Sequence, residues 1–265
     1  MRTPTLMLTT ALLTLVSIAC AQTEPAPGDR RGDLSPPAQA PADDPVGQLI
    51  EAINADENGI TLDREARTVD IAAKVCLREA EFLEQFACSP DTREHESILV
   101  LNAQPSMIHT GMLLLGLEPG SPLTWVEEGD RVRTIAPRGP EVQVFIVTTD
   151  DEGEETVVPA NTWVKDQKTD EPMVGNTWLF AGSKFVEVNG EEMYVADAYG
   201  TAISLVSFGD DLLARAGDLT DQNDSHGKVW GTNTEVIPAV GTEVRVRLVL
   251  PAASENPAPA GPESD

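Results

Sequence analysis

The chain has 265 residues, and its 44 acidic and 18 basic side chains give a formal net charge of −26 at pH 7. This surplus of acid argues against nucleic-acid binding, which needs an excess of Lys and Arg. The three cysteines are too few for the four thiolates of an ordinary iron–sulfur cluster or for a disulfide-stapled miniature fold.

Residues 1–21 are typical of an export signal, because a basic start is followed by a short apolar stretch and small residues. The apolar stretch is shorter than the roughly 20 residues that cross a bilayer. Two processing routes fit this segment. Either residues 17–20 are a lipobox and Cys20 becomes the lipidated first residue, or the chain is cut before Gln22 and released. We expect the first route, which predicts a periplasmic or cell-envelope lipoprotein held to the membrane by its lipid.

The rest of the chain divides by composition into a linker, a body and a tail. Residues 22–45 are rich in Pro, Ala and Asp, and residues 251–265 are rich in Pro and acid. Neither segment has enough apolar surface to fold, so both are predicted to be disordered. Residues 46–250 are therefore predicted to form one globular domain, which is long enough to bury a sizeable core.

The first part of the body is predicted to contain one helix and three strands. A short helix is expected at 46–54, where the apolar residues share one stripe. Strands are expected at 69–77 and 82–88, paired as a hairpin across 78–81, and a third strand at 97–102.

A second helix is expected at about 105–117. Pro105 suits a helix start, and Gly116 lies at its end. The segment between them is apolar nearly all round, which is typical of a helix buried against a sheet.

The remainder is predicted to be short strands bounded by Gly, Pro, Asn and Asp. Asn189-Gly190 is a strong hairpin-turn signal between two of them. The predicted strands are 142–148, 156–159, 185–188, 193–196, 202–208 and 244–250, with a short helix at 210–216. Together these elements predict an α+β fold that is predominantly antiparallel β, with one buried helix at about 105–117 and one or two short helices.

Two cysteines lie in the body. If 69–77 and 82–88 pair as a hairpin, Cys76 and Cys88 lie opposite one another, and an oxidising compartment permits a disulfide between them. Two inert free thiols, or a metal-binding or redox pair, are the alternatives.

Two histidines form the other candidate site. Glu94, His95 and Glu96 begin a predicted strand, and His109 lies in the first turn of the apolar helix that follows it. If these elements pack closely, His95, His109 and a carboxylate from Glu94 or Glu96 converge. Imidazole with carboxylate suits zinc or another transition metal, and it equally suits acid–base catalysis. A structural hydrogen-bond network is the third interpretation.

Several segments of the body resemble the YdjY domain family over about residues 65–250. They are 74–77 (KVCL), 86–88 (FAC), 94–99 (EHESIL), 105–109 (PSMIH), 117–122 (LEPGSP), 178–183 (WLFAGS) and 197–200 (DAYG). The resemblance implies a domain of exported bacterial proteins. It supplies no reaction, because the family has no settled activity.

The sequence favours a non-enzymatic module that binds a small ligand or an envelope protein and reaches the membrane through lipid on Cys20. The alternative is a metal-dependent or acid–base envelope enzyme that uses the cluster of His and Glu side chains. The sequence leaves open whether the protein is an enzyme.

Overall fold

The computed structural model describes residues 44–215 and 229–252. The predicted export signal with Cys20, nearly all of the linker and most of the tail lie outside the described residues. Among the described residues, no helix is long and apolar enough to cross a bilayer.

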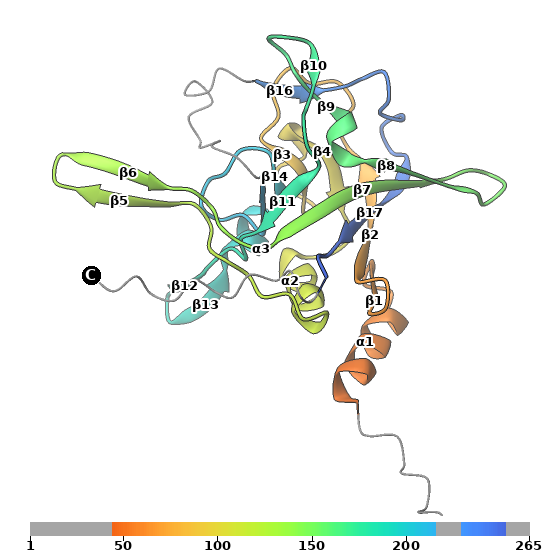
Figure 1. Ribbon diagram of the computed structural model, residues 1–265, viewed down its shortest axis with the longest axis horizontal. Coiled ribbons are helices and arrows are strands. Elements are labelled where there is room, and N and C mark those ends of the chain that lie inside the picture. The colour runs from red at the N-terminus through yellow and green to blue at the C-terminus, as the bar shows by residue number, and fades with distance from the viewer. Residues whose placement is uncertain (1–43, 216–228, 253–265) are drawn as a thin grey trace, which may run out of the picture. The chain divides into compact units, whose positions relative to one another are not determined.

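Strands dominate the described part of the chain, and eight of them close into a barrel (Figure 1). Neighbouring strands are antiparallel, except that β15 runs parallel to β14 and β3 runs parallel to β4. The ring closes where β4 pairs with β2. In order around the barrel the strands are β2 (Thr68–Val75), β17 (Glu243–Val249), β7 (Glu141–Thr149), β11 (Thr177–Phe180), β15 (Leu213–Arg215), β14 (Thr201–Ser204), β3 (Gln85–Cys88) and β4 (Ser97–Leu101).

The predicted α+β class is therefore wrong, since the described residues are mostly β and hold only three short helices. These are α1 (Pro45–Ala55), α2 (Pro105–Leu114) and α3 (Val195–Tyr199). Helix α2 is not the buried centre of the domain. Only one stripe of it, which includes Ile108 and Met112, is covered, while Leu113 is 45% exposed.

The core lies inside the barrel and is built from alternate strand residues, which point to the same face of a sheet. The predicted alternation in β17 is confirmed, because Val246 and Leu248 are fully buried. Trp178 of β11 is also fully buried, packs 6.0 Å from the ring of Phe86 and donates from Nε1 to the carbonyl of Ser204.

Two predicted hairpins are confirmed. Strand β7 turns at 150–154 into β8 (Glu155–Pro159), which pairs with it outside the ring. Strands β12 (Phe185–Val188) and β13 (Glu191–Tyr194) are joined at Asn189-Gly190, where both residues have positive φ, as a tight hairpin turn requires.

Other pairings differ from the prediction. Segment 82–88 does not pair with 69–77, since β3 lies between β4 and β14. The helix expected at 210–216 is not formed within the described residues, where β15 occupies 213–215.

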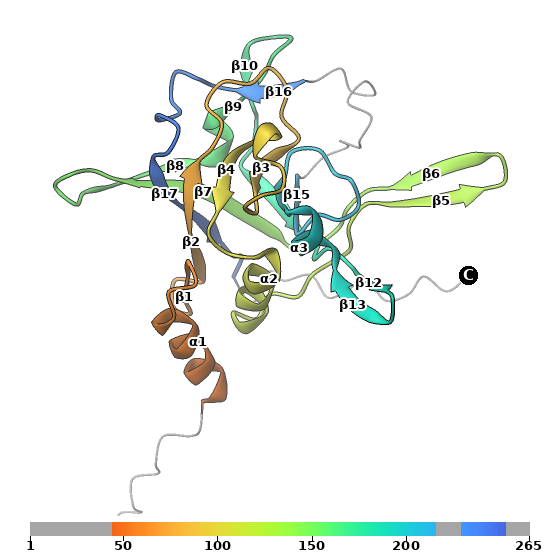
Figure 2. The same cartoon turned by 180° about the vertical axis from the view of Figure 1, so that it is seen from behind.

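Several strands were not predicted from the sequence. They are β1 (Ile60–Asp63), which pairs with β2, the barrel strands β11 and β15, the hairpin of β5 (Thr124–Glu128) and β6 (Arg131–Ile135), and the small sheet of β9 (Val164–Asp166), β10 (Glu171–Pro172) and β16 (Trp230–Thr232). The β5–β6 hairpin extends well away from the barrel in both views (Figure 2).

Candidate functional site

A groove with a volume of about 810 Å³ crosses the outside of the barrel, where β4, β2, β17 and β7 lie side by side. Its floor includes the small apolar side chains of Ala72, Val100 and Val147. The strand register explains why these side chains meet. Val147 and Ala72 are both paired with Arg245, and Val100 is paired with Lys74.

Both signs of charge line the groove. Arg245 is held by two carboxylates, because its Nη1 donates to Asp70 Oδ2 at 2.8 Å and its Nη2 donates to Glu155. Lys74 is restrained less, since its Nζ lies 3.9 Å from Glu243 and its side chain is 52% exposed. An apolar floor with a few polar groups above it is typical of small-ligand sites.

One wall of the groove is the turn η1 (Glu94–Glu96), a single turn of 3-10 helix that leads into β4. Glu94 lines the groove, and its Oε1 accepts from the backbone N–H of Asp91 at 2.5 Å. The predicted metal ligand Glu94 is therefore part of the groove wall.

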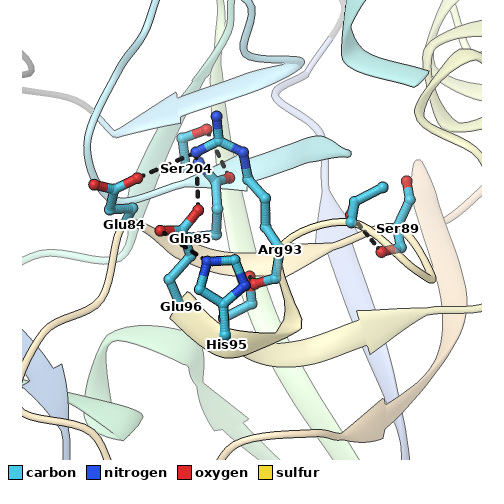
Figure 3. Close-up of polar contacts among 9 residues, drawn as sticks. Glu84, Gln85, Ser89, Arg93, His95, Glu96 and Ser204 are labelled. Carbon is cyan, nitrogen blue, oxygen red and sulfur yellow. Dashed lines mark hydrogen bonds and ion pairs between the residues drawn. The ribbon is translucent and has the colours of Figure 1, made fainter. Parts of the chain in front are cut away.

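Glu96 of the same turn belongs to a different cluster, which is drawn in Figure 3. Arg93 Nη1 donates to Glu96 Oε1 at 3.0 Å and to Glu84 Oε2 at 3.1 Å, and the guanidinium lies 5.1 Å from the centre of the Phe208 ring. His95 Nε2 is 3.8 Å from Glu96 Oε2, but its side chain is 77% exposed. Arg93 therefore clamps two carboxylates, and His95 lies at their edge.

Glu84 is the member of this cluster whose pKa is raised. Burial, followed by the charge of Glu96 and a hydrogen bond with it, raises the pKa of Glu84 to about 7. Glu84 is thus a group that can give or take a proton in the range where acid–base catalysts work.

This raised pKa predicts a pH-dependent contribution to stability. The folded state binds more protons than the unfolded state between pH 4.5 and about 7, so the contribution of Glu84 is full below 4.5 and is lost as the pH rises through 7. We expect the stability of Glu84→Gln relative to wild type to rise by about 1–2 kcal/mol between pH 4.5 and pH 8, after allowance for solvent screening.

Urea unfolding of both proteins at the two pH values measures this change. The Glu79→Gln variant of an exposed side chain is the control, for which we expect no such rise. A difference in the free energy of unfolding between Glu84→Gln and wild type that stays constant across the range would contradict the raised pKa of Glu84.

Cys76 and Cys88 are free thiols in the structure. They lie within hydrogen-bonding reach of one another although their strands are not paired as predicted. Cys88 is fully buried and Cys76 is half-buried, with its Sγ donating to the carbonyl of Ser97 at 3.1 Å. The contact with the Cys76 thiol lowers the pKa of Cys88 to about 7, and the same contact raises the pKa of Cys76.

His109 lies apart from the other predicted metal ligands. Turn η1 and helix α2 are at opposite ends of β4, whose five residues span about 17 Å. Within residues 44–215 and 229–252, no three His, Cys, Asp or Glu side chains are grouped as a metal site. Glu94, His95, Glu96 and His109 therefore do not form one centre, because an extended strand separates them.

A hydrogen-bond relay fixes His109 instead. Tyr194 donates from its hydroxyl to the carbonyl of Gly182 at 3.0 Å, so Nδ1 of His109 must donate to that hydroxyl at 2.8 Å. Burial lowers the pKa of His109, and the ring of Phe180 meets it edge-on at 5.0 Å. His109 is thus a neutral imidazole with a structural role, which is one of the interpretations left open by the sequence.

Comparison with known proteins identifies the family of this chain. Residues 60–249 match the model of the YdjY domain. The chain belongs to the YdjY domain family. Neither a search of curated proteins nor a search of solved structures found a match. The predicted resemblance is therefore confirmed, and it leaves the activity of this YdjY domain to be argued from its own residues.

The segments that carry the family resemblance contact one another in this YdjY domain. Ser106 at the start of α2 donates its backbone N–H to Asp197 at 2.8 Å, and Gly120 donates its backbone N–H to the carbonyl of Phe180 at 2.9 Å. The His109 relay also ends on the carbonyl of Gly182, within 178–183. Much of the resemblance thus lies in contacts that hold the barrel end together.

Three ionisable groups of the YdjY domain were not predicted from the sequence. Glu84 and Arg93 join the acid cluster only because the turn at η1 folds back on β3. Asp211 is almost wholly buried and accepts from the hydroxyl of Ser207, and burial raises its pKa. No spacing motif marks these residues, since Glu84 and Arg93 come from different segments and the four-residue spacing of Ser207 and Asp211 matches no catalytic motif.

Proposed function

We propose that this YdjY domain is an exported, lipid-anchored and non-enzymatic binding module of the cell envelope, and that its ligand occupies the groove across β4, β2, β17 and β7. The groove is the observation that supports the proposal. Its volume of about 810 Å³ falls within the roughly 300–1,000 Å³ typical of small-molecule sites. A concave site of this size suits a small ligand better than a protein surface.

The lining indicates the kind of ligand. Ala72, Val100 and Val147 offer an apolar floor, and Lys74 offers the cation that is restrained least. An apolar body with an anionic group therefore matches the groove. The dye 1-anilinonaphthalene-8-sulfonate has this chemistry and serves as a probe.

Titration of the full chain with this dye, with Cys76 and Cys88 reduced as they are in the structure, tests the proposal. We expect saturable binding by the wild type, and binding weaker by roughly tenfold or more in Ala72→Trp, whose indole fills the floor. Ala66→Trp adds the same side chain at an exposed turn and should bind as the wild type does. Equal affinity in both variants, or no binding by the wild type, would reject the groove.

The envelope address is proposed from the sequence, with its basic start, apolar stretch and Cys20. We expect wild-type chain expressed in a bacterial host to sediment with membranes and to incorporate labelled palmitate. The Cys20→Ser chain should lose the label and be released from the membrane. Unlabelled wild-type chain in the soluble fraction would contradict the anchor.

A Cys76–Cys88 disulfide belongs to the same proposal, because an exported chain meets an oxidising compartment. Their mutual contact supports it. A count of free thiols after denaturation of exported Cys20→Ser chain should give none. Two free thiols would contradict the bond.

Acid–base catalysis is a second candidate function, favoured by the proton that Glu84 holds near neutral pH. The group for this chemistry is Glu84 with Arg93, Glu96 and His95, and it leaves out Glu94 and His109. Carboxyl ¹³C NMR should show Glu84 titrating near pH 7. Titration near its ordinary value of 4.5 would remove the support for this candidate.

A further inference from the structure

We propose that Cys76 and Cys88 are a redox control on the groove, and that closing a bond between them narrows the groove and weakens ligand binding. The inference depends on the proposed function for the ligand, and it adds how that binding is regulated. Three observations support it: the place of the thiols beside the groove wall, the contact of Cys76 with the wall turn, and the strand ends that they join.

Both thiols are close in the chain to residues that line the groove. Lys74 precedes Cys76 by two positions on β2, and Pro90 follows Cys88 by two positions after β3. Strands β2 and β3 flank β4 on its two sides. A bond between the two sulfurs therefore ties together two sides of the groove.

Cys76 also contacts the turn that forms the groove wall. Cys76 Sγ lies 3.8 Å from the carbonyl oxygen of Glu94, and Glu94 lines the groove. Cys76 donates to the carbonyl of Ser97, the first residue after that turn. Oxidation removes this donor, so the turn loses a contact that holds it in place.

Bond formation shortens the distance between the sulfurs. A disulfide S–S bond is about 2.05 Å, which is shorter than any non-bonded contact between two sulfur atoms. Closing it draws the end of β2 and the end of β3 toward one another. The space between Lys74 and Pro90 then shrinks, which predicts weaker binding in the oxidised state.

A low-molecular-weight disulfide is the oxidant, and the exchange balances. Cys88, whose pKa is the lower of the two, loses its proton to water. Cys76 is the thiol of the pair that reaches solvent; it passes its proton to the Cys88 thiolate as it attacks one sulfur of the oxidant, which releases one thiolate. Cys88 then gives that proton to the released thiolate, attacks Cys76 Sγ and releases the second thiolate. Two protein thiols thereby lose two protons and two electrons, and the oxidant becomes two thiols.

The test uses full-length Cys20→Ser chain, which retains only this pair of cysteines. We expect reduced chain to label at two thiols and to bind 1-anilinonaphthalene-8-sulfonate. After treatment with oxidised glutathione it should label at none and bind the dye about fivefold more weakly or worse. Dithiothreitol should restore both readouts.

Cys76→Ser in the same background keeps a half-buried hydroxyl at this position and should bind equally with and without oxidised glutathione. Cys88→Ala removes the buried thiol of the pair and should likewise bind the dye equally with and without oxidised glutathione. Unchanged dye affinity after full oxidation would overturn the redox control while leaving the groove proposal standing. Failure of the thiols to oxidise would also overturn it. No dye binding in either state would reject both proposals.

Discussion

Replacing Trp178 by Ala is expected to lower the free energy of unfolding by about 3–5 kcal/mol. Trp178 is fully buried within the barrel, where its ring packs on Phe86 and under the guanidinium of Arg215. Truncation leaves a large cavity and also removes the donor to the carbonyl of Ser204. Urea unfolding followed by circular dichroism measures the loss.

Trp125→Ala is the matched control, since Trp125 lies on the projecting β5–β6 hairpin and is 40% exposed. Its truncation should cost less than about 1 kcal/mol. Equal losses for the two variants would contradict a barrel core centred on Trp178.

Asp70→Ala is expected to cost about 2–3 kcal/mol, the second largest of the predicted effects. Its carboxylate, largely shielded from solvent, accepts from Arg247 Nε at 2.7 Å and Nη2 at 2.6 Å, and from Arg245 Nη1 at 2.8 Å. Removing it leaves two guanidinium groups close together on β17 without the shared anion.

The same substitution should weaken dye binding, because Asp70 helps to orient Arg245 at the groove. Asp70→Asn keeps the shape but loses the charge, so it should recover only part of the stability. Glu65→Ala, at an exposed turn, should change neither quantity. A loss below about 0.5 kcal/mol for Asp70→Ala would show that the pairs are too solvated to matter.

Local sequence patterns correctly predicted the elements that depend only on neighbouring residues. Asn189-Gly190 fixed a turn through the φ values that it permits, and the alternation of 244–250 predicted which side faces the core. The family resemblance was likewise available from short segments of sequence.

Barrel closure was not predictable in the same way, because it depends on pairings between distant segments. Strand β3 lies next to β4 and β14, and no residue of 82–88 indicates either partner. The apolar run at 105–117 suggested a helix buried all round. One stripe of that helix faces the barrel, and Leu113 meets solvent.

The candidate sites also divide into features with a local sequence signal and features that depend on distant strand pairings. The sequence singled out Cys76 and Cys88 as a pair through a hairpin that the structure does not contain, and a bond between them stays a prediction. It placed His95 and His109 together because few residues separate them, but those residues form an extended strand. The groove itself had no sequence signal, since its floor comes from alternate residues of four strands.

Methyl NMR of the valine-labelled full chain tests the groove proposal most directly. During titration with 1-anilinonaphthalene-8-sulfonate, the account predicts saturable shifts at the methyls of Val100 and Val147, which line the groove. The exposed Val132 and Val240 should not respond. Shifts confined to those exposed valines, or no saturable shift at Val100 and Val147, would contradict binding in the groove.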